Sequence, residues 1–287
     1  MRTFRRFPKT ASLSIFTAAM LTIAFALAAQ TPNAQRPIIV QGAMPIETDR
    51  LIAQLQGAKV EQVGGWTFWR GTIDGYPVVV SKTLKGVSSA AAATAIAVER
   101  YHPIAIINQG TAGGHDPALH LYDIVVGTSS ISIGAFRSRF RPTGRGSNPL
   151  DWRPLDLTAS EGSAGNDPNA RHIASFEGDA DLLAAAHSAK SSYSRGRIVD
   201  GVIGSSDVWN DELDLIALYH KEYGTSVEEM ETASAAHVAK ELNVPFVGIR
   251  IVSDNITNDS PYDPKTAEAC EDFVYQVVKS YVRARKR

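Results

Sequence analysis

The chain has 287 residues, of which 44% are hydrophobic and 21% are charged. This content is enough for one large core or two small ones. The formal net charge of −1 gives no indication of a nucleic-acid surface or an acidic tail. The single cysteine, Cys270, excludes an intrachain disulfide, and its apolar surroundings favour a packing role.

The first 29 residues have the layout of a secretory signal peptide. An uncharged apolar run, ASLSIFTAAMLTIAFALAA, follows a basic segment containing Arg2, Arg5, Arg6 and Lys9. We expect cleavage near residues 28–34 and export to the periplasm or the medium, with no membrane segment afterwards. The alternative is an uncleaved anchor, because the run is near the length that spans a bilayer. Removing the four basic residues leaves a mature charge of about −5.

Beyond the leader, strand patterns alternate with helical ones. Residues 36–55 predict a short strand, a glycine-containing turn and a helix. A buried strand is predicted from residue 103, ending in a glycine-rich turn at GTAGG (110–114). Further strands are predicted within 76–86, 123–133, 196–207 and 244–254, and helices within 88–102 and 266–287.

Several of these strands are continuous apolar runs, which is typical of strands covered on both faces. Helical segments lie between them. The pattern therefore predicts a three-layer α/β/α sandwich around a central, largely parallel sheet. One domain over residues 36–287 is favoured over two, because no linker-like change of composition divides the core pattern.

Residues 137–175 interrupt this pattern. The segment is rich in Arg, Gly, Pro, Ser and Asn, and it has no sustained period. Loops of this length are usually functional or mobile. Its four arginines between 137 and 145 either contact an anionic ligand or belong to a solvated surface insertion.

Residues 226–255 place acidic groups on an otherwise apolar helix–strand unit. Ser226 and Glu229 have the spacing of a capping box, so a helix is predicted to begin at Ser226. Glu231 would then share a face with the buried stripe, where a carboxylate needs donors such as a pair of sugar hydroxyls. Glu229 either takes part in the site or serves only as the cap. Arg250, in the following apolar strand, could neutralise a nearby carboxylate.

Three strand ends carry groups suited to chemistry. Glu47, Thr111 and Asp254 each follow a predicted strand, and open α/β sheets bind ligands outside the carboxyl ends of strands. Together they predict general acid–base catalysis on a small polar molecule, although a lone Asp after a strand is more often a turn or cap residue. GTAGG lacks the spacing of a dinucleotide or phosphate loop. With no zinc spacing and no nucleophile elbow either, we expect neither metal nor cofactor.

Four segments, in this order, resemble the purine nucleoside phosphorylase/nucleosidase superfamily. They are GAMPIE (42–47), NQGTAGG (108–114), VEEMETASAAHVAKELNVPF (227–246) and RIVSDN (250–255). They are most similar to its hydrolytic branch, the 5′-methylthioadenosine/S-adenosylhomocysteine nucleosidases. The resemblance implies a mixed, twisted central sheet and a homodimer whose partner closes the 5′ end of the pocket.

The resemblance also implies catalytic roles for three carboxyl groups. Glu47 would activate the attacking water, and Asp254 would donate a proton to N7 of the departing purine. Glu231 would accept hydrogen bonds from the ribose hydroxyls. An N-glycosidic bond breaks with positive charge on the sugar and negative charge on the base, so carboxyl groups at these places fit the reaction.

Eight further positions are expected to bind substrate: Thr111, Ala112, Gly113, Trp209, Glu229, Met230, Arg250 and Ser253. Thr111 replaces a serine that helps hold the water. Met230 would pack on the ribose, Trp209 would stack on the base, and Ser253 would steady Asp254. Tyr262 is expected to have a place in the pocket lid.

The resemblance favours water over phosphate as the nucleophile. Phosphorylase relatives bind phosphate with an arginine shortly after the first strand, whereas here no arginine occurs until Arg50. We therefore predict hydrolysis of a purine nucleoside of the methylthioadenosine/S-adenosylhomocysteine type. The alternatives are a phosphate-dependent phosphorylase and an exported nucleoside-binding or storage protein without catalysis. The segment 137–175 departs from the family pattern, which leaves the 5′ group and the base preference open.

Overall fold

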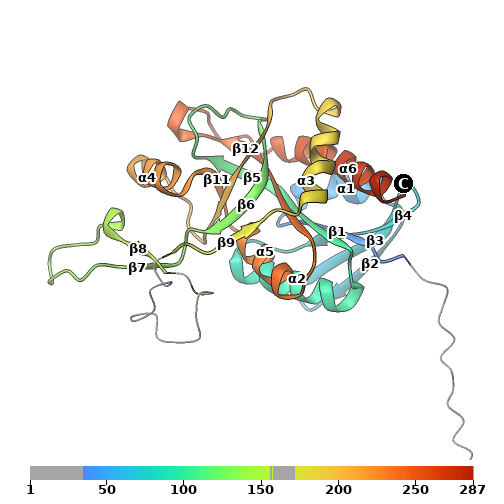
Figure 1. The fold of residues 1–287 in the computed structure, drawn as a ribbon, viewed down its shortest axis with the longest axis horizontal. Helices are drawn as coiled ribbons and strands as arrows, with labels where there is room; N and C mark the ends of the chain where they lie inside the picture. The colour runs from blue at the N-terminus through green and yellow to red at the C-terminus, as the bar shows by residue number, and fades with distance from the viewer. Residues whose placement is uncertain (1–34, 156, 158–171, 287) are drawn as a thin grey trace, which may run out of the picture. The chain divides into compact units, whose positions relative to one another are not determined.

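The computed structural model describes residues 35–155, 157 and 172–286. The predicted leader lies outside the described residues. A central mixed sheet is covered by helices on both faces (Figure 1), which confirms the predicted α/β/α architecture. The strand order is β11-β10-β6-β12-β5-β1-β4-β3-β2, and the pairs at the centre of the sheet are mostly parallel.

The sheet is assembled from strands that are far apart in the chain. Their bounds are β1 Ile38–Gly42, β2 Gln56–Val63, β3 Trp66–Ile73, β4 Tyr76–Lys82, β5 Ala105–Gly114, β6 Ile124–Ser132, β9 Ser175–Glu177, β10 Ile198–Ser205, β11 Thr225–Glu229 and β12 Phe246–Asp254. Every residue of β12 is buried. Burial along the whole strand explains why this segment is a continuous apolar run and not an alternating one.

Helices cover the two faces of the sheet. They are α1 Asp49–Gln54, α2 Val87–Tyr101, α3 Ala180–Ala189, α4 Leu213–Tyr223, α5 Thr232–Glu241 and α6 Thr266–Arg285. Helices α1, α3 and α6 share one hydrophobic cluster, α2 and α5 share a second, and α4 contributes to a third. Buried alanines such as Ala93 and Ala236 leave room for α2 and α5 to pack closely. Cys270 is fully buried in α6, in the predicted packing role.

The prediction of a helix that begins at Ser226 is wrong. Residues Thr225–Glu229 form strand β11, which pairs parallel with β10 and antiparallel with β5. Helix α5 begins only at Thr232. Sheet pairing with distant strands therefore outcompetes the local capping signal, as tertiary context commonly does.

The glycine-rich turn predicted at 110–114 is also wrong. Strand β5 continues through Gly114. It pairs with β12 as far as Gly113, and Gly114 pairs with Val227 of β11. The glycines instead let neighbouring side chains approach the backbone of β5 closely. A Cβ at Gly110 would lie only 2.6 Å from Glu47 Oε1.

Some elements were not predicted. The hairpin of β2 and β3 turns at Gly64 and Gly65, and its outer strand is largely exposed, so it lacks an apolar run. Helices α3 and α4 and the short strand β9 were also missed.

Residues 136–155, here called the arm, project from the sheet (Figure 1). Strands β7 (Phe136–Arg137) and β8 (Arg153–Pro154) pair as a separate two-stranded sheet. Phe140 is 90% exposed. Residues 156 and 158–171 of the predicted insertion lie outside the described part. None of the helices in the described ranges combines the length and hydropathy needed to span a bilayer.

Candidate active site

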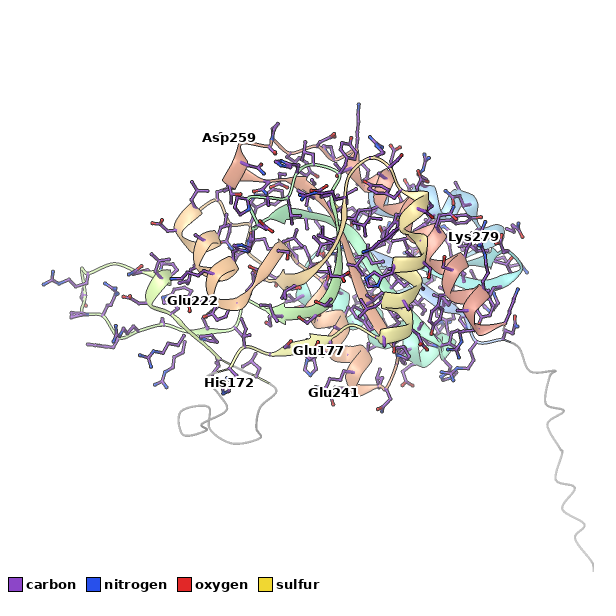
Figure 2. The ribbon with its side chains drawn as sticks, turned by 45° about the horizontal axis from the view of Figure 1, so that its top comes forward. His172, Glu177, Glu222, Glu241, Asp259 and Lys279 are labelled. Atoms are coloured by element: carbon purple, nitrogen blue, oxygen red, sulfur yellow. The ribbon has the colours of Figure 1, made fainter. Side chains whose placement is uncertain are left out.

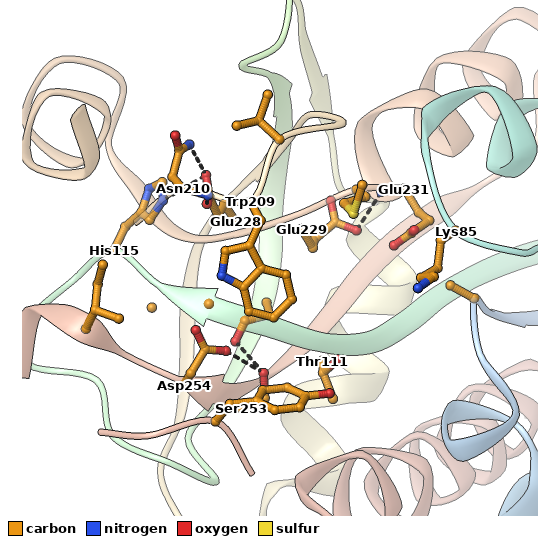
Figure 3. Close-up of a pocket in the computed structure, with 18 of the residues that line it drawn as sticks. Lys85, Thr111, His115, Trp209, Asn210, Glu228, Glu229, Glu231, Ser253 and Asp254 are labelled. Atoms are coloured by element: carbon orange, nitrogen blue, oxygen red, sulfur yellow. Dashed lines mark hydrogen bonds and ion pairs between the residues drawn. The ribbon is translucent and has the colours of Figure 1, made fainter. Parts of the chain in front are cut away.

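A cavity of about 260 Å³ lies beside the carboxyl-terminal ends of β5 and β12 (Figure 3). Ten of the predicted site residues line it: Glu47, Thr111, Ala112, Gly113, Trp209, Glu229, Met230, Glu231, Ser253 and Asp254. They come from five separate segments of the chain. The expectation that Glu47, Thr111 and Asp254 meet in one crevice is therefore confirmed, with Thr111 lying within β5 and not after it. Arg250 is the exception, because it does not line the cavity.

Glu47 is held by donors from two segments. Its Oε2 accepts hydrogen bonds from the backbone N–H groups of Ala43 (2.9 Å) and Met44 (3.1 Å). Its Oε1 accepts from the Thr111 N–H (2.9 Å) and the Thr111 hydroxyl (3.0 Å). The side chain is 2% exposed. This carboxylate is fixed as an acceptor next to a hydroxyl oxygen, an arrangement that can orient a water molecule.

Asp254 ends β12 beside a register shift. The pairing with β5 is regular up to Val252, and Asp254 then pairs with Gly113, so Ser253 is the extra residue. Such a bulge can redirect a side chain at the end of a strand. The Ser253 hydroxyl donates to Asp254 Oδ1 at 2.9 Å. A Cβ at Gly113 would lie 3.3 Å from Asp254 Oδ2, so the glycine leaves the carboxyl group room.

Burial raises the pKa of Asp254, with a smaller contribution from the negative charge of Glu228, while the Ser253 hydrogen bond opposes the shift. Taking a carboxyl group out of water disfavours its charged form. The acid form of Asp254 therefore persists to a higher pH than that of a solvated aspartate. This property is needed by a group that protonates a departing base.

Glu231 precedes the first residue of α5 and faces the cavity. Its Oε1 accepts a hydrogen bond from the Gly86 N–H at 2.9 Å. Burial, together with the nearby charge of Glu229, raises the pKa of Glu231 to about 8. Glu231 is therefore a buried carboxyl group that can exchange hydrogen bonds with hydroxyl groups of a ligand.

Glu229 and Arg250 form a buried ion pair. Arg250 is 1% exposed and also bonds to Asn108 and Thr232. The Glu229 carboxylate accepts from the N–H groups of Glu231 (2.9 Å) and Thr232 (3.0 Å). Glu229 therefore does cap a helix, but it caps the helix that begins at Thr232 and not one that begins at Ser226. The predicted neutralisation of a carboxylate by Arg250 is confirmed, and Arg250 itself does not line the cavity.

Trp209 and Tyr262 lie together at the cavity. Their ring centroids are 5.9 Å apart, and their planes are inclined by 74°. Trp209 is 62% exposed, so much of its side chain is accessible at the cavity. An exposed aromatic face beside a cavity is suited to stacking on a flat ring.

Sequence reasoning missed four polar residues that line the cavity: Lys85, His115, Asn210 and Glu228. Figure 3 shows His115, Asn210 and Glu228 together on one side and Lys85 with Glu231 on the other. Glu228 was missed because the segment was interpreted as the first turn of a helix, where an acidic residue is ordinary. The arginines at 137–145 do not line the cavity, and Arg141 pairs with Asp151.

Comparison with known proteins shows extensive similarity. Residues 37–283 match the family described as the phosphorylase superfamily. The 5′-methylthioadenosine/S-adenosylhomocysteine nucleosidase of Bacillus cytotoxicus is 30% identical over 249 residues, which cover 84% of this chain and 98% of that protein.

Solved structures of nucleosidases share the fold. The 5′-methylthioadenosine/S-adenosylhomocysteine nucleosidase of Neisseria meningitidis, in complex with methylthio-immucillin-A, has a TM-score of 0.69 at 26% identity, covering 85% of this chain and 99% of that chain. The nucleosidase of the same description from Colwellia psychrerythraea, in complex with adenine, has a TM-score of 0.69 at 29% identity, covering 86% and 96%.

Proposed function

Because the chain belongs to the phosphorylase superfamily, we propose that it hydrolyses the N-glycosidic bond of a purine nucleoside. The observation that carries the proposal is the meeting of Asp254 and Glu47 at one cavity. The pKa of Asp254 is raised, and Glu47 is held by hydrogen bonds from two segments. The nucleosidase names of the relatives support the same reaction.

In the proposed mechanism, Asp254 in its acid form donates a proton to N7 of the purine as the bond to the sugar breaks. The negative charge that develops on the base is neutralised at that moment. Glu47 and the Thr111 hydroxyl hold a water molecule, which attacks the positively charged sugar carbon and passes a proton to Glu47. Glu231 exchanges hydrogen bonds with the ribose hydroxyls, while Met230 and Trp209 pack on the sugar and the base.

Water is the proposed nucleophile because the cavity offers little to bind phosphate. Among the described residues that line it, Lys85 is the only lysine or arginine. Arg250 does not line the cavity and is held in its ion pair. Arg50, the first arginine after β1, is bonded to Asp272 at 2.6 Å. Phosphate is usually bound by bidentate contacts from arginine. Arg250 and Arg50 are both engaged with carboxylates and therefore do not offer such contacts to a ligand.

5′-Methylthioadenosine and S-adenosylhomocysteine, named for the relatives, are the reference substrates of the proposal. We further propose that the protein is exported and forms a homodimer. The basic and apolar leader supports export. Exposed apolar side chains on or next to the arm support self-association: Phe140, Leu150, Trp152 and Leu157.

The decisive experiment measures base release from nucleosides with and without phosphate, for the wild type and Asp254→Asn. We expect phosphate-independent release that falls by about 10²–10⁴-fold in the variant, the usual contribution of a general acid. In the wild type, kcat should fall as pH rises through the raised pKa of Asp254, because only the acid form donates. Asp259→Asn, at an exposed position (labelled in Figure 2), is the matched control and should retain full activity.

Two outcomes would contradict this proposal. Release that requires phosphate would identify a phosphorylase. No release from any nucleoside, with binding retained, would leave a nucleoside-binding protein.

A further inference from the structure

Glu228 is a buried carboxylate that the proposed mechanism does not use. It lies on β11, is 8% exposed and lines the cavity. Its Oε1 accepts from the Asn210 backbone N–H at 2.9 Å, and its Oε2 accepts from the Asn210 side-chain amide at 2.7 Å. Asn210 therefore fixes both carboxylate oxygens in place. Each oxygen still has a lone pair for another donor.

His115 adds a second polar group next to this carboxylate. The ring is 2% exposed and lines the cavity. Its Nδ1 lies 2.7 Å from the Thr225 hydroxyl. Its Nε2 lies 3.1 Å from Glu228 Oε2, yet it forms no hydrogen bond within the described part of the chain. A buried ring nitrogen without a partner costs free energy unless a ligand supplies one.

The position of this cluster assigns it to the base and not to the sugar. Figure 3 shows Glu228, Asn210 and His115 on the side of the cavity away from Glu231 and Lys85, with Asp254 on their side. Glu228 also contributes to the raised pKa of Asp254. If Asp254 protonates N7, as proposed above, the next groups along the base edge are the 6-substituent and N1.

The chemistry of that edge differs between purines. A 6-oxopurine carries an acceptor at O6 and a donor at N1–H, and guanine adds a donor at the 2-amino group. Adenine carries a donor at the 6-amino group and only a lone pair at N1. A fixed carboxylate attracts a ring N–H and repels a ring lone pair. The Asn210 backbone N–H could have donated a hydrogen bond to N1 of adenine, but it already donates to Glu228.

We propose that Glu228 and His115 select a 6-oxopurine, with the Glu228 carboxylate accepting from N1–H and His115 Nε2–H donating to O6. The Thr225 hydroxyl then donates to His115 Nδ1, which fixes the tautomer that places the proton on Nε2. This inference rests on the proposed nucleoside hydrolysis and narrows its substrates to inosine and guanosine types. It also sets the chain apart from the Colwellia psychrerythraea relative, which is solved with adenine.

The first test changes the substrate and leaves the protein intact. Values of kcat/KM for base release are measured with inosine, guanosine, 1-methylinosine, adenosine and 5′-methylthioadenosine. Inosine and guanosine should exceed adenosine by about 10- to 100-fold, the usual effect of a hydrogen bond to a charged group. 1-Methylinosine, which lacks N1–H, should fall by a similar factor relative to inosine.

The second test uses Glu228→Gln. An amide at this position can present a donor to N1, so the preference should move towards adenosine by about 10-fold or more. Glu241→Gln, at an exposed position on α5, is the matched control and should keep the wild-type order. Equilibrium binding of hypoxanthine and adenine to both variants and to the wild type gives the same comparison without catalysis.

These results separate the two proposals. If no nucleoside is hydrolysed, the proposed function fails, and the binding of the free bases still decides the inference. If adenosine and 5′-methylthioadenosine are hydrolysed as well as inosine or better, and hypoxanthine binds no tighter than adenine, the inference is wrong and the hydrolase remains. In that case Glu228 accepts from the 6-amino group of adenine.

Discussion

At the scale of single residues, the cavity depends on how buried charges are paired. Arg250 is fully buried and holds Glu229, which in turn holds the backbone that carries Glu231. Sequence reasoning gave Arg250 a contact with substrate, whereas in the structure Arg250 contacts Glu229, which lines the cavity. The ion pair therefore positions Glu229 and Glu231 at the wall of the cavity, while Arg250 itself does not line it.

This arrangement predicts a large cost for Arg250→Met. Removing one partner of a buried pair leaves the other charge uncompensated, which typically costs about 3–5 kcal/mol. Urea titration should show this loss in the free energy of unfolding. Arg50→Met is the matched control, because Arg50 pairs with Asp272 near the surface, where such pairs contribute about 1 kcal/mol or less. Equal effects of the two substitutions would contradict the structural importance of the buried pair.

At the scale of elements, helices α1 and α6 meet through a buried carboxyl group. Glu271 of α6 accepts a hydrogen bond from the Leu51 N–H of α1 at 2.8 Å. Burial raises the pKa of Glu271 to about 8. Helix α1 follows Glu47 directly, so this contact also supports the segment that carries the proposed base.

The raised pKa predicts that stability falls with rising pH. Between the unfolded value near 4.5 and the folded value near 8, the folded state holds a proton that the unfolded state has released. The stabilising contribution is fully present below the lower value and is lost as pH rises towards the upper one. The loss is at most about 1.4 kcal/mol per pH unit from this group.

Glu271→Gln should flatten this dependence, because the amide keeps an acceptor for Leu51 and does not titrate. The measurement is the free energy of unfolding from pH 6 to pH 9 for the wild type, Glu271→Gln and the exposed control Glu268→Gln. The control should follow the wild type. A Glu271→Gln curve as steep as the wild-type curve would show that another group, such as Glu231, dominates.

At the scale of the whole molecule, export and self-association can be measured on one sample. The full chain, expressed with its own leader in a bacterial host, should be recovered from the periplasm without its first 28–34 residues. Light scattering should then give about twice the mass of the processed chain. Mass spectrometry that finds the intact amino terminus would contradict cleavage, and a monomeric mass at high protein concentration would contradict the homodimer.

The sequence by itself determined most of the architecture and much of the site. Apolar runs predicted the buried strands, because covering both faces of a sheet leaves no place for alternation. The groups at strand ends, Glu47, Thr111 and Asp254, were predicted to converge because parallel strands end at one edge. These features depend on local pattern and on a general rule of topology, so no knowledge of distant contacts was needed.

Only the tertiary structure decided how residues 225–231 are used. The local signal favoured a helix from Ser226, but pairing with β10 and β5 makes Thr225–Glu229 a strand. That change brings Glu228 to Asn210, 18 residues away in the chain, and to His115 on another strand exit. Contacts between segments so far apart leave no periodic pattern in the local sequence. Their free energy is gained only when the sheet has formed.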